Sequence, residues 1–375
     1  MKKQHIQTLA IHAGEKKGKN TDIIQPIHLS TTFERNEDGT TGEYIYTRAE
    51  NPNRIAVEQK MASIEGAKTA IAFASGMAAI NALFNTLLEP NCHILIPDDC
   101  YHGTRQLLDN FFKRWNVQSE MVDMTNVINI EKTIQPNTKL IWIETPSNPQ
   151  LKITDIEAVV SLAKKKAIVT VCDNTFATPI LQKTLEIGID YVMYSSTKFF
   201  SGHSDILGGA VLTNKEDEVS QSIRNYQKMA GAVPSPFDCW LLNRSLATFP
   251  LRFKAQCENA TTIARYLITH SKIEKVFYPG LTSHENHEIA KKQMKNGFGS
   301  IISILVKGNQ EKALQFTSKL QIFKHATSLG GVESLVEHRR SVEGTNPISP
   351  ENLIRLSIGI EYIDDLIADL EQALM

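Results

Sequence analysis

Residues 168–198 read IVTVCDNTFATPILQKTLEIGIDYVMYSSTK and contain two short runs, Ile168–Asp173 and Tyr191–Tyr194, that are mostly apolar. Neither run alternates regularly between apolar and polar residues. Such runs are typical of strands in a parallel sheet that helices cover on both faces. Asp173 ends the first run, and Lys198 follows shortly after the second. The stretch therefore predicts a buried sheet with functional side chains at the carboxyl ends of its strands.

Short and long segments alternate in the same way on both sides of this stretch. A helix is expected from about Pro52, because Val57, Met61 and Ile64 recur at helical spacing and Gly66 then ends the pattern. Further strands are expected at Thr69–Ala74, His93–Pro97 and Lys139–Glu144, and further helices at Gly76–Leu88, Gly103–Trp115 and Ile153–Lys165. This order predicts an α/β domain with a mainly parallel sheet and helices on both faces.

The pattern differs at the two ends of the chain. Residues 1–50 are irregular and polar, which predicts an extended N-terminal arm, and residues 51–246 form the large domain. Beyond residue 246 the order changes, and residues 247–375 are expected to form a smaller α+β domain. Its expected elements are a long helix at Leu251–His270, strands at Ser300–Val306 and Leu353–Ile358, and a closing helix at Ile363–Leu374.

Composition excludes several classes of function. The 375 residues carry a formal net charge of -1, which argues against a general nucleic-acid binder. The longest nearly apolar stretch, Ala70–Phe84, is too short to span a membrane, and the N-terminus lacks the apolar segment of a signal peptide. The five cysteines form no C-x-x-C pair, and His284 and His287 have no evident third ligand, so no metal site is expected. We expect a cytoplasmic enzyme.

Lys198 closes the segment Tyr194-Ser195-Ser196-Thr197-Lys198, directly after an expected strand. Lysine forms Schiff bases with carbonyl compounds and needs local control of its charge to act as a nucleophile or base. Ser195 and Thr197 alternate with Ser196 and could present two hydroxyls to one phosphate. An alternative is a lysine whose charge reaches solvent at the rim of the sheet, and this pentapeptide alone favours neither reading.

Asp173 favours the chemical interpretation. A carboxylate at the end of an apolar strand is costly unless a cation pairs with it. A pyridinium nitrogen is one candidate, since an aspartate that keeps it protonated makes pyridoxal phosphate an electron sink. The alternative is that Asp173 caps the following turn.

Two weaker signals follow other expected strands. Ser75-Gly76-Met77 lies at a strand-to-helix turn, where backbone amides can bind a phosphate. Tyr101 could stack on a flat ring, although a lone tyrosine also serves in packing. Positions 76, 101, 173 and 198 each follow a different strand, so coincidence is a poor explanation for their arrangement, and pyridoxal phosphate is one candidate ligand.

The sequence also resembles the Cys/Met-metabolism family of pyridoxal-phosphate enzymes, which includes cystathionine γ-synthase, cystathionine γ-lyase, cystathionine β-lyase and methionine γ-lyase. The resemblance runs over nearly the whole chain. Its motifs are Tyr46-Thr47-Arg48 with Asn51-Pro52, Ser75-Gly76-Met77, Glu144-Thr145-Pro146-Ser147-Asn148-Pro149, Asp173-Asn174-Thr175-Phe176-Ala177, Ser195-Ser196-Thr197-Lys198, Ser328-Leu329-Gly330-Gly331-Val332-Glu333-Ser334 and Arg355-Leu356-Ser357-Ile358-Gly359-Ile360-Glu361.

The resemblance implies an aminotransferase-like fold and a role for each matching residue. Lys198 would hold pyridoxal 5'-phosphate as a Schiff base and act as the general base, with Asp173 at the ring nitrogen and Tyr101 stacked on the ring. Arg355 would bind the substrate α-carboxylate, assisted by Ser328 and Asn148. Tyr46 and Arg48 would reach the phosphate from a neighbouring subunit, so the smallest active unit would be a homodimer, with a homotetramer expected. The phosphate itself would be held by Gly76, Met77, Ser195 and Thr197.

The implied activity is elimination or replacement at the β- or γ-carbon of a sulfur amino acid in transsulfuration, within cysteine and methionine biosynthesis. We favour γ-synthase or γ-lyase chemistry. Methionine γ-lyase and cystathionine β-lyase remain alternatives, and so does a regulatory protein that binds the cofactor and works through partners.

Several positions depart from the family's patterns. Ile45 and Thr327 stand where cystathionine γ-lyases and bacterial γ-synthases typically carry glutamates that receive the distal amino group of cystathionine. Gly103 replaces the cysteine usual in methionine γ-lyases, and Leu329 a tryptophan of many β-lyases. The segment 337–346 also departs, and it either brings Arg339 or Arg340 towards an acidic substrate or forms a solvated loop.

Overall fold

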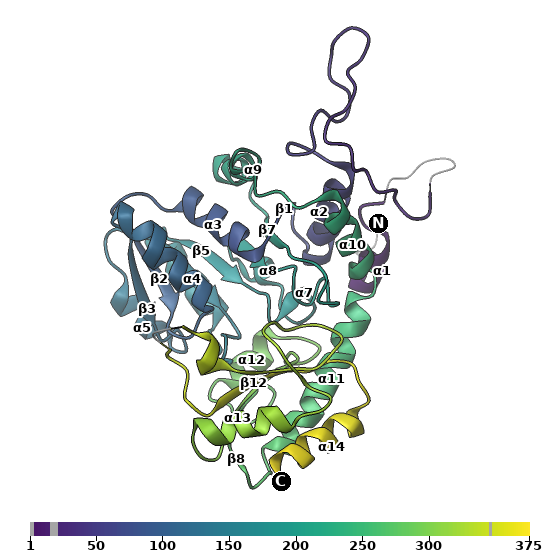
Figure 1. Ribbon diagram of the computed structural model, residues 1–375. Helices are drawn as coiled ribbons and strands as arrows, with labels where there is room; N and C mark the ends of the chain where they lie inside the picture. Colours follow the sequence, from purple (N-terminus) through teal and green to yellow (C-terminus); the bar gives the residue numbers. More distant parts are fainter. Residues whose placement is uncertain (1–3, 16–21, 345–346) are drawn as a thin grey trace.

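The computed structural model describes residues 4–15, 22–344 and 347–375. The predicted arm and the segment 337–346 therefore each include positions that lie outside the described residues. Figure 1 shows two bodies, each built around a sheet, and a loop before Pro52 that extends beyond the larger body. Helix α1 (Ile6–His12) instead packs against that body through the buried Ala10. No described helix is both long and apolar enough to cross a bilayer.

The larger body contains a seven-stranded sheet with the order β1-β7-β6-β5-β4-β2-β3. Strand β7 pairs antiparallel with both of its neighbours, and the other paired strands run parallel. The mainly parallel sheet predicted from the sequence is therefore present, with one reversed strand. The strands are β1 (Thr69–Phe73), β2 (His93–Pro97), β3 (Gln118–Val122), β4 (Thr138–Glu144), β5 (Val169–Asp173), β6 (Tyr191–Tyr194) and β7 (Gly209–Thr213).

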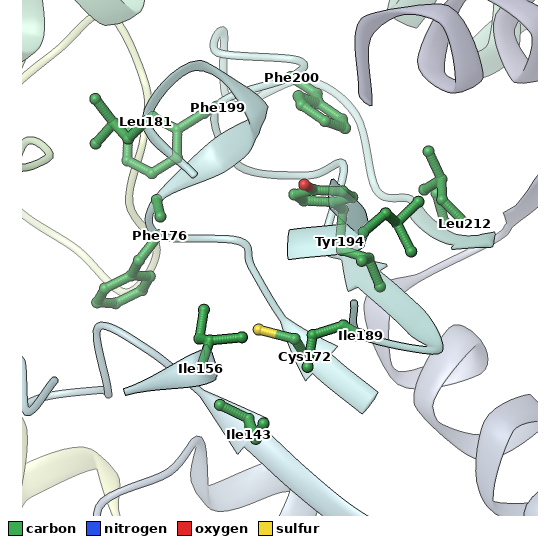
Figure 2. Close-up of a cluster of buried hydrophobic side chains, with 14 of the residues drawn as sticks. Ile143, Ile156, Cys172, Phe176, Leu181, Ile189, Tyr194, Phe199, Phe200 and Leu212 are labelled. Carbon is green, nitrogen blue, oxygen red and sulfur yellow. The ribbon is translucent and has the colours of Figure 1, made fainter. Parts of the chain in front are cut away.

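Both faces of this sheet are buried. Along β4, Ile141 and Ile143 pack into one core cluster while Leu140 and Trp142 pack into another. Figure 2 shows part of the first cluster, in which Cys172 lies among apolar side chains. This burial on both faces explains the continuous apolar runs in the sequence.

Helices cover the sheet and connect its strands. Figure 1 shows α3 and α4 over one region of the sheet. The helical segments that precede residue 247 are α1 (Ile6–His12), α2 (Pro52–Glu65), α3 (Gly76–Leu87), α4 (His102–Leu107), the π-helix η1 (Leu108–Phe112), the 3₁₀-helix η2 (Lys113–Trp115), α5 (Val127–Thr133), α6 (Ile156–Lys166), α7 (Thr178–Leu181), α8 (Thr184–Ile187), α9 (Glu218–Ala230) and α10 (Pro236–Leu246).

The smaller body contains a five-stranded sheet with the order β10-β11-β12-β9-β8. All of its pairings are antiparallel except that of β10 with β11. Its elements are β8 (Ile273–Phe277), α12 (His287–Gln293), β9 (Ile301–Val306), α13 (Gln310–Lys319), β10 (Lys324–His325), β11 (Leu335–His338), the 3₁₀-helix η3 (Arg339–Val342), β12 (Leu353–Ser357) and α14 (Ile363–Leu374).

Helix α11 (Phe249–Leu267) packs against both bodies. Phe249 and Phe253, near its start, belong to a core cluster of the large sheet, whereas Ile263 and Leu267, near its end, belong to the core of the small sheet. Figure 1 shows this helix running beside both. The domain limits 1–50, 51–246 and 247–375 stay predictions, because α11 contributes to two cores.

The strands predicted from apolar runs are confirmed within one residue at each end, and α14 is confirmed at both ends. Strand β7 was not predicted, although all five of its residues are buried. The arm contains a short helix, α1, that was not predicted. The helix predicted at Gly103–Trp115 is instead three short segments of different geometry, α4, η1 and η2.

Candidate active site

The carboxyl ends of β2, β4, β5 and β6 open onto a cavity of about 380 Å³, and residues from the small-sheet body close it. A volume of this size suits a small ligand. The wall contains most of the residues predicted from the sequence, namely Gly76, Met77, Tyr101, Asn148, Asp173, Ser195, Thr197, Lys198, Ser328 and Arg355. Tyr46 and Arg48 are not among its lining residues.

Lys198 lies in a tight loop after β6. Its backbone N–H donates to the carbonyl of Ser195 at 3.1 Å, and the N–H of Gly202 donates to the carbonyl of Lys198 at 2.8 Å. Its side-chain Nζ donates to Ser328 Oγ at 2.9 Å. Burial, and then the nearby charge of Arg355, lower the pKa of the lysine to about 8. A neutral, reactive amine is therefore available near physiological pH.

Arg252, which was not predicted from the sequence, binds the backbone of this loop. Its guanidinium donates to the carbonyls of Phe199 at 3.1 Å and Phe200 at 3.2 Å. Gly202 makes room for it, because a Cβ there would lie 1.7 Å from Arg252 Nη1, and its φ of +65° also favours glycine. No local pattern predicts this contact, since Arg252 comes from α11, a distant part of the sequence.

Asp173 is buried at the end of β5. Its Oδ1 accepts from the backbone N–H of Thr175 at 3.0 Å, so it does cap the following turn, as the alternative reading held. Burial nevertheless raises its pKa to about 6. No ion pair to Asp173 occurs among the described residues, so this carboxylate still lacks the cation that its burial calls for.

Glu144, at the end of β4, was quoted in a motif but given no role. Its Oε2 accepts from the backbone N–H of Tyr101 at 2.9 Å. Burial, and then the proximity of Asp173, raise its pKa well above the ordinary value. The hydrogen bond holds the chain at Tyr101 close to the strand ends.

Tyr101 lies against the wall of the cavity, beside the ring of His102, with ring centroids 4.7 Å apart. Burial raises the pKa of its phenol. Gly103 is needed for this placement, because a Cβ at that position would lie 2.5 Å from Tyr101 Cε1. A cysteine at position 103 would therefore require the tyrosine ring to move.

Two turns meet at another side of the cavity. Ser75 caps α3, and its Oγ accepts from the N–H of Ala78 at 3.0 Å. A Cβ at Gly76 would lie 3.0 Å from Ser195 Oγ, so the start of α3 and the turn after β6 are adjacent. The hydroxyl of Thr197 donates to the carbonyl of Gly208 at 3.1 Å. A helix start beside these hydroxyls is suited to an anion.

Arg355 lies on β12 and is fully buried in this site. Its guanidinium donates to Asn148 Oδ1 at 3.0 Å and to the carbonyl of Ser328 at 2.9 Å. Its Nη2 is also 2.8 Å from Glu337 Oε2. The three residues assigned to substrate binding therefore meet, and Glu337 joins them without having been predicted.

Glu337 is shared between two arginines. The Oε2 atom that pairs with Arg355 also accepts from Arg339 Nη1. Burial opposes ionisation of Glu337, but Arg355 and Arg339 hold its pKa below the ordinary value. Arg339 lines the cavity, whereas Arg340 is exposed and donates to the carbonyl of Ser349 at 3.1 Å. Of the two arginines considered from the sequence, only Arg339 faces the site.

Tyr46 and Arg48 lie outside the cavity of their own chain. Tyr46 is 44% exposed, and the guanidinium carbon of Arg48 lies 5.6 Å from the centre of its ring. Arg48 Nη1 also donates to the carbonyl of Lys228 at 2.8 Å. A single chain therefore does not bring these two residues to Lys198.

The residues present fit pyridoxal phosphate. An amine of lowered pKa lines the same cavity as a buried carboxylate that lacks a cation, and these match the aldehyde and the pyridinium nitrogen. The start of α3 beside Ser195 matches the phosphate. Lys198 and Asp173 share one cavity, as the sequence-based hypothesis requires.

Comparison with known proteins identifies a family. The sequence profile of the family described as Cys/Met metabolism PLP-dependent enzyme matches residues 7–375. Cystathionine gamma-synthase of Mycobacterium bovis is 44% identical over 374 residues, covering 98% of this chain and 96% of that protein. Cystathionine beta-lyase of Coxiella burnetii is 40% identical over 383 residues, covering 100% of this chain and 98% of that protein.

The fold is also that of a solved relative. The crystal structure of cystathionine gamma-lyase from Lactobacillus plantarum, complexed with L-serine, superposes with a TM-score of 0.93. It is 37% identical in sequence, and the alignment covers 99% of this chain and 98% of that one. The resemblance predicted from the motifs is confirmed, and so is the aminotransferase-like fold class.

Proposed function

The chain belongs to the Cys/Met metabolism family of pyridoxal-phosphate-dependent enzymes, and we propose that it eliminates or replaces a substituent on the β- or γ-carbon of a sulfur amino acid in transsulfuration. Within this class we favour the γ-carbon chemistry of a cystathionine γ-synthase or γ-lyase. Relatives with the names of a synthase and of lyases support the class of reaction.

One observation carries the proposal: Lys198, Asp173 and Arg355 line the same cavity. The lysine and the aspartate can bind the cofactor, and the buried arginine can bind an amino acid. The planar guanidinium can bind both oxygens of an α-carboxylate. When bound, pyridoxal phosphate supplies an electron-poor ring that stabilises negative charge at the substrate α-carbon. The residues proposed to hold it are Lys198, Asp173, Tyr101, Gly76, Met77, Ser195 and Thr197.

Other side chains of this site orient the substrate and transfer its proton. Arg355, with Asn148 and Ser328, orients the substrate through its α-carboxylate. Lys198 takes the proton from the α-carbon, because its pKa of about 8 leaves part of the amine neutral at physiological pH. The bond from Lys198 Nζ to Ser328 Oγ keeps the amine beside the carboxylate site. Asp173 would hold the ring nitrogen of the cofactor in its protonated form.

Chemistry at the γ-carbon needs a second proton transfer, from the β-carbon, before the substituent leaves. Tyr101 is the candidate to assist, because its ring lines the cavity and the charges of Arg339 and Arg355 influence the pKa of its phenol. Burial raises the pKa of this phenol, so it is neutral at physiological pH and could donate its proton to the departing substituent. The proton that leaves the β-carbon would then go to the neutral amine of Lys198.

Product analysis tests the proposal. The loaded enzyme is incubated with cystathionine, with methionine, and with an O-acylated homoserine plus cysteine, and keto acid and thiol are assayed. Cystathionine made from the ester indicates a γ-synthase, and α-ketobutyrate with cysteine from cystathionine indicates a γ-lyase. Pyruvate from cystathionine indicates the β-lyase alternative, and α-ketobutyrate from methionine the methionine γ-lyase. No product from any of them would overturn the proposal.

Turnover by the unmodified, cofactor-loaded protein distinguishes an enzyme from the regulatory alternative, and Lys198→Ala is its control. Lys198→Ala removes the amine without adding bulk. If the protein is an enzyme, turnover disappears while the folded structure remains. If the unmodified, cofactor-loaded protein shows no turnover and still binds the cofactor, the regulatory reading is favoured instead.

We further propose a homodimer as the smallest active unit, with two dimers joined as a tetramer, in the cytoplasm. The positions of Tyr46 and Arg48, outside the cavity of their own chain, support a site shared between subunits. The five free, buried cysteines are compatible with a reducing compartment. Light scattering of the purified protein would give the assembly state.

A further inference from the structure

Two buried carboxyl groups lie side by side at the strand ends. Glu144 ends β4 and Asp173 ends β5, and the two residues are register partners in this parallel pair. Neighbouring strands lie about 4.8 Å apart, and side chains at the same register point to the same face of the sheet. Both residues are buried, and both line the cavity. The two carboxyl groups therefore share one small, poorly hydrated region.

Neither carboxyl group is paired with a cation. In the described parts of the chain, no lysine, arginine or histidine forms an ion pair with Glu144 or with Asp173. In the proposed function, the ring nitrogen of the cofactor supplies one positive charge at Asp173. A second negative charge beside this pair would remain buried and unpaired, which is costly. One of the two carboxyl groups is then expected to keep its proton.

The surroundings of Glu144 favour its neutral form. Burial, and then the charge of Asp173, raise the pKa of Glu144 well above the ordinary value, and Asp99 adds further negative charge. The other titratable groups close to Glu144 are Cys100, Cys172 and Tyr101. None of them supplies a positive charge. Burial raises the pKa of Asp173 less, to about 6. Asp173 is therefore the group that ionises first.

Glu144 also contacts two segments of the site. Its Oε2 accepts from the backbone N–H of Tyr101 at 2.9 Å, and the backbone N–H of Asn148 interacts with the same carboxyl group. The side chain of Asn148 in turn accepts from Arg355 at 3.0 Å. A protonated carboxyl group still accepts hydrogen bonds. Glu144 can therefore hold both segments without adding charge to the site.

Building on the proposed function, we propose that Glu144 is a positioning residue that keeps its proton in the assembled site while it holds the segments of Tyr101 and Asn148. Asp173 then carries the negative charge opposite the ring nitrogen, and Glu144 adds none. A negative charge on Glu144 would repel Asp173 and would also oppose the entry of a substrate carboxylate. Two neighbouring carboxyl groups thus have different roles: one supplies charge, and the other accepts hydrogen bonds.

Infrared spectroscopy tests the proton directly. A protonated carboxyl group has a C=O stretching band above the amide band, and an ionised group lacks it. The difference spectrum of wild type minus Glu144→Gln should contain this band at pH 7, both with pyridoxal phosphate bound and without it.

Glu343→Gln is the matched control for this spectrum. Glu343 is also buried, and its Oε2 accepts from the backbone N–H groups of Ile348 at 2.9 Å and Ser349 at 3.0 Å. Burial opposes its ionisation, but hydrogen bonds from Ser349 and Ile348 hold its pKa below the ordinary value. The spectrum of wild type minus Glu343→Gln should therefore lack the band.

Absence of the band from the Glu144→Gln difference spectrum in either state would overturn the proposal, because Glu144 would then be ionised there. Failure of Glu144→Gln to fold would also count against it, since a neutral side chain of the same length should be tolerated. The spectrum of cofactor-free protein does not depend on the reaction. If the wild type binds no pyridoxal phosphate, the proposed function has failed instead.

Binding constants test the positioning role. Glu144→Gln keeps the length and an acceptor oxygen, so the dissociation constant of pyridoxal phosphate and the KM of the amino acid should stay within about threefold of the wild type. Glu144→Ala removes the acceptor, and both constants should rise by about 2- to 10-fold relative to Glu144→Gln. Equal losses in the two variants would show that the ionised carboxylate is needed and would contradict the proposal.

Discussion

Lys198 and Ser328 are joined by a hydrogen bond of 2.9 Å from Nζ to Oγ, which links the large-sheet body to the small one. The carbonyl of the same serine accepts from Arg355 at 2.9 Å. Ser328 therefore connects the proposed base with the proposed carboxylate site. Its φ of +122° is a conformation that non-glycine residues rarely adopt.

Ser328→Ala should lower kcat by about 2- to 10-fold, because one hydrogen bond that orients the amine is lost. Cofactor loading should persist, since Lys198 itself is retained, and the visible absorption of the bound cofactor measures it. Ser328→Gly is the paired control. It loses the same hydroxyl but relieves the backbone strain, so its melting temperature should exceed that of Ser328→Ala. Equal melting temperatures would argue against strain at this position.

The pKa of Lys198, lowered to about 8, predicts how fast cofactor-free protein captures pyridoxal phosphate. Only the neutral amine attacks an aldehyde, so the capture rate should rise about tenfold per pH unit below pH 8 and level off above it. Stopped-flow absorbance follows the reaction. For an exposed lysine, the capture rate would keep rising towards pH 10.

Arg355→Gln provides the control for this profile. Arg355 is the second cause of the lowered lysine pKa, after burial. Without this charge, the capture rate should level off at a higher pH than in the wild type, although no substrate is present. An unchanged profile would mean that burial alone sets the reactivity of the amine.

Asp173→Asn should separate stability from activity. In the cofactor-free protein, burial raises the Asp173 pKa to about 6, against 3.8 in the unfolded chain. The unfolded chain therefore releases this proton first as pH rises, and the folded protein loses stability between these two values. Cofactor-free Asp173→Asn should melt at a higher temperature than the wild type at pH 7, and the difference should vanish near pH 4.

With the cofactor bound, the same substitution should instead be harmful, because it should lower activity. Asparagine cannot pair as an anion with the ring nitrogen, and loss of a buried ion pair costs about 3–5 kcal/mol, or roughly 100- to 1,000-fold or more in rate. Steady-state kcat with saturating cofactor measures this. A nearly active Asp173→Asn would contradict the proposed pairing.

Strands β5 and β6 and the residues after them were predictable, because burial on both faces leaves a continuous apolar run. Strand β3 was not predicted, since it lies at the edge of the sheet and most of its residues are exposed. Strand β7 was not predicted either, although it is fully buried between β1 and β6, so burial alone did not make every strand recognisable.

Contacts between distant segments were the part that sequence could not supply. Arg252 reaches the lysine loop from α11, and Glu337 holds both Arg355 and Arg339 across two strands and a turn. Neither residue stands in a pattern that predicts its partner. The sequence could only leave Arg339 and Arg340 as equivalent candidates, and the cavity separates them.

The lysine loop provides a matched pair of glycine substitutions. Gly202 and Gly231 both have positive φ, +65° and +77°, but only Gly202 has a neighbour at its Cβ position, Arg252. Gly231→Ala should cost about 1 kcal/mol of unfolding free energy from backbone strain alone. Gly202→Ala should cost more and should also slow cofactor capture by Lys198, because Arg252 must release the loop carbonyls. Equal effects of the two substitutions would show that the Arg252 contact is dispensable.

A site shared between subunits predicts complementation between two defective variants. If Arg48 reaches the phosphate of the neighbouring subunit, Lys198→Ala and Arg48→Ala damage opposite sides of each site. A dimer with one chain of each kind then contains one site with both residues intact and one with neither. Unfolding and refolding an equal mixture should therefore restore roughly a quarter of the wild-type activity, since half of the dimers are mixed. If Arg48 instead serves the cavity of its own chain, no mixed dimer contains an intact site, and activity stays at the sum of the two variants.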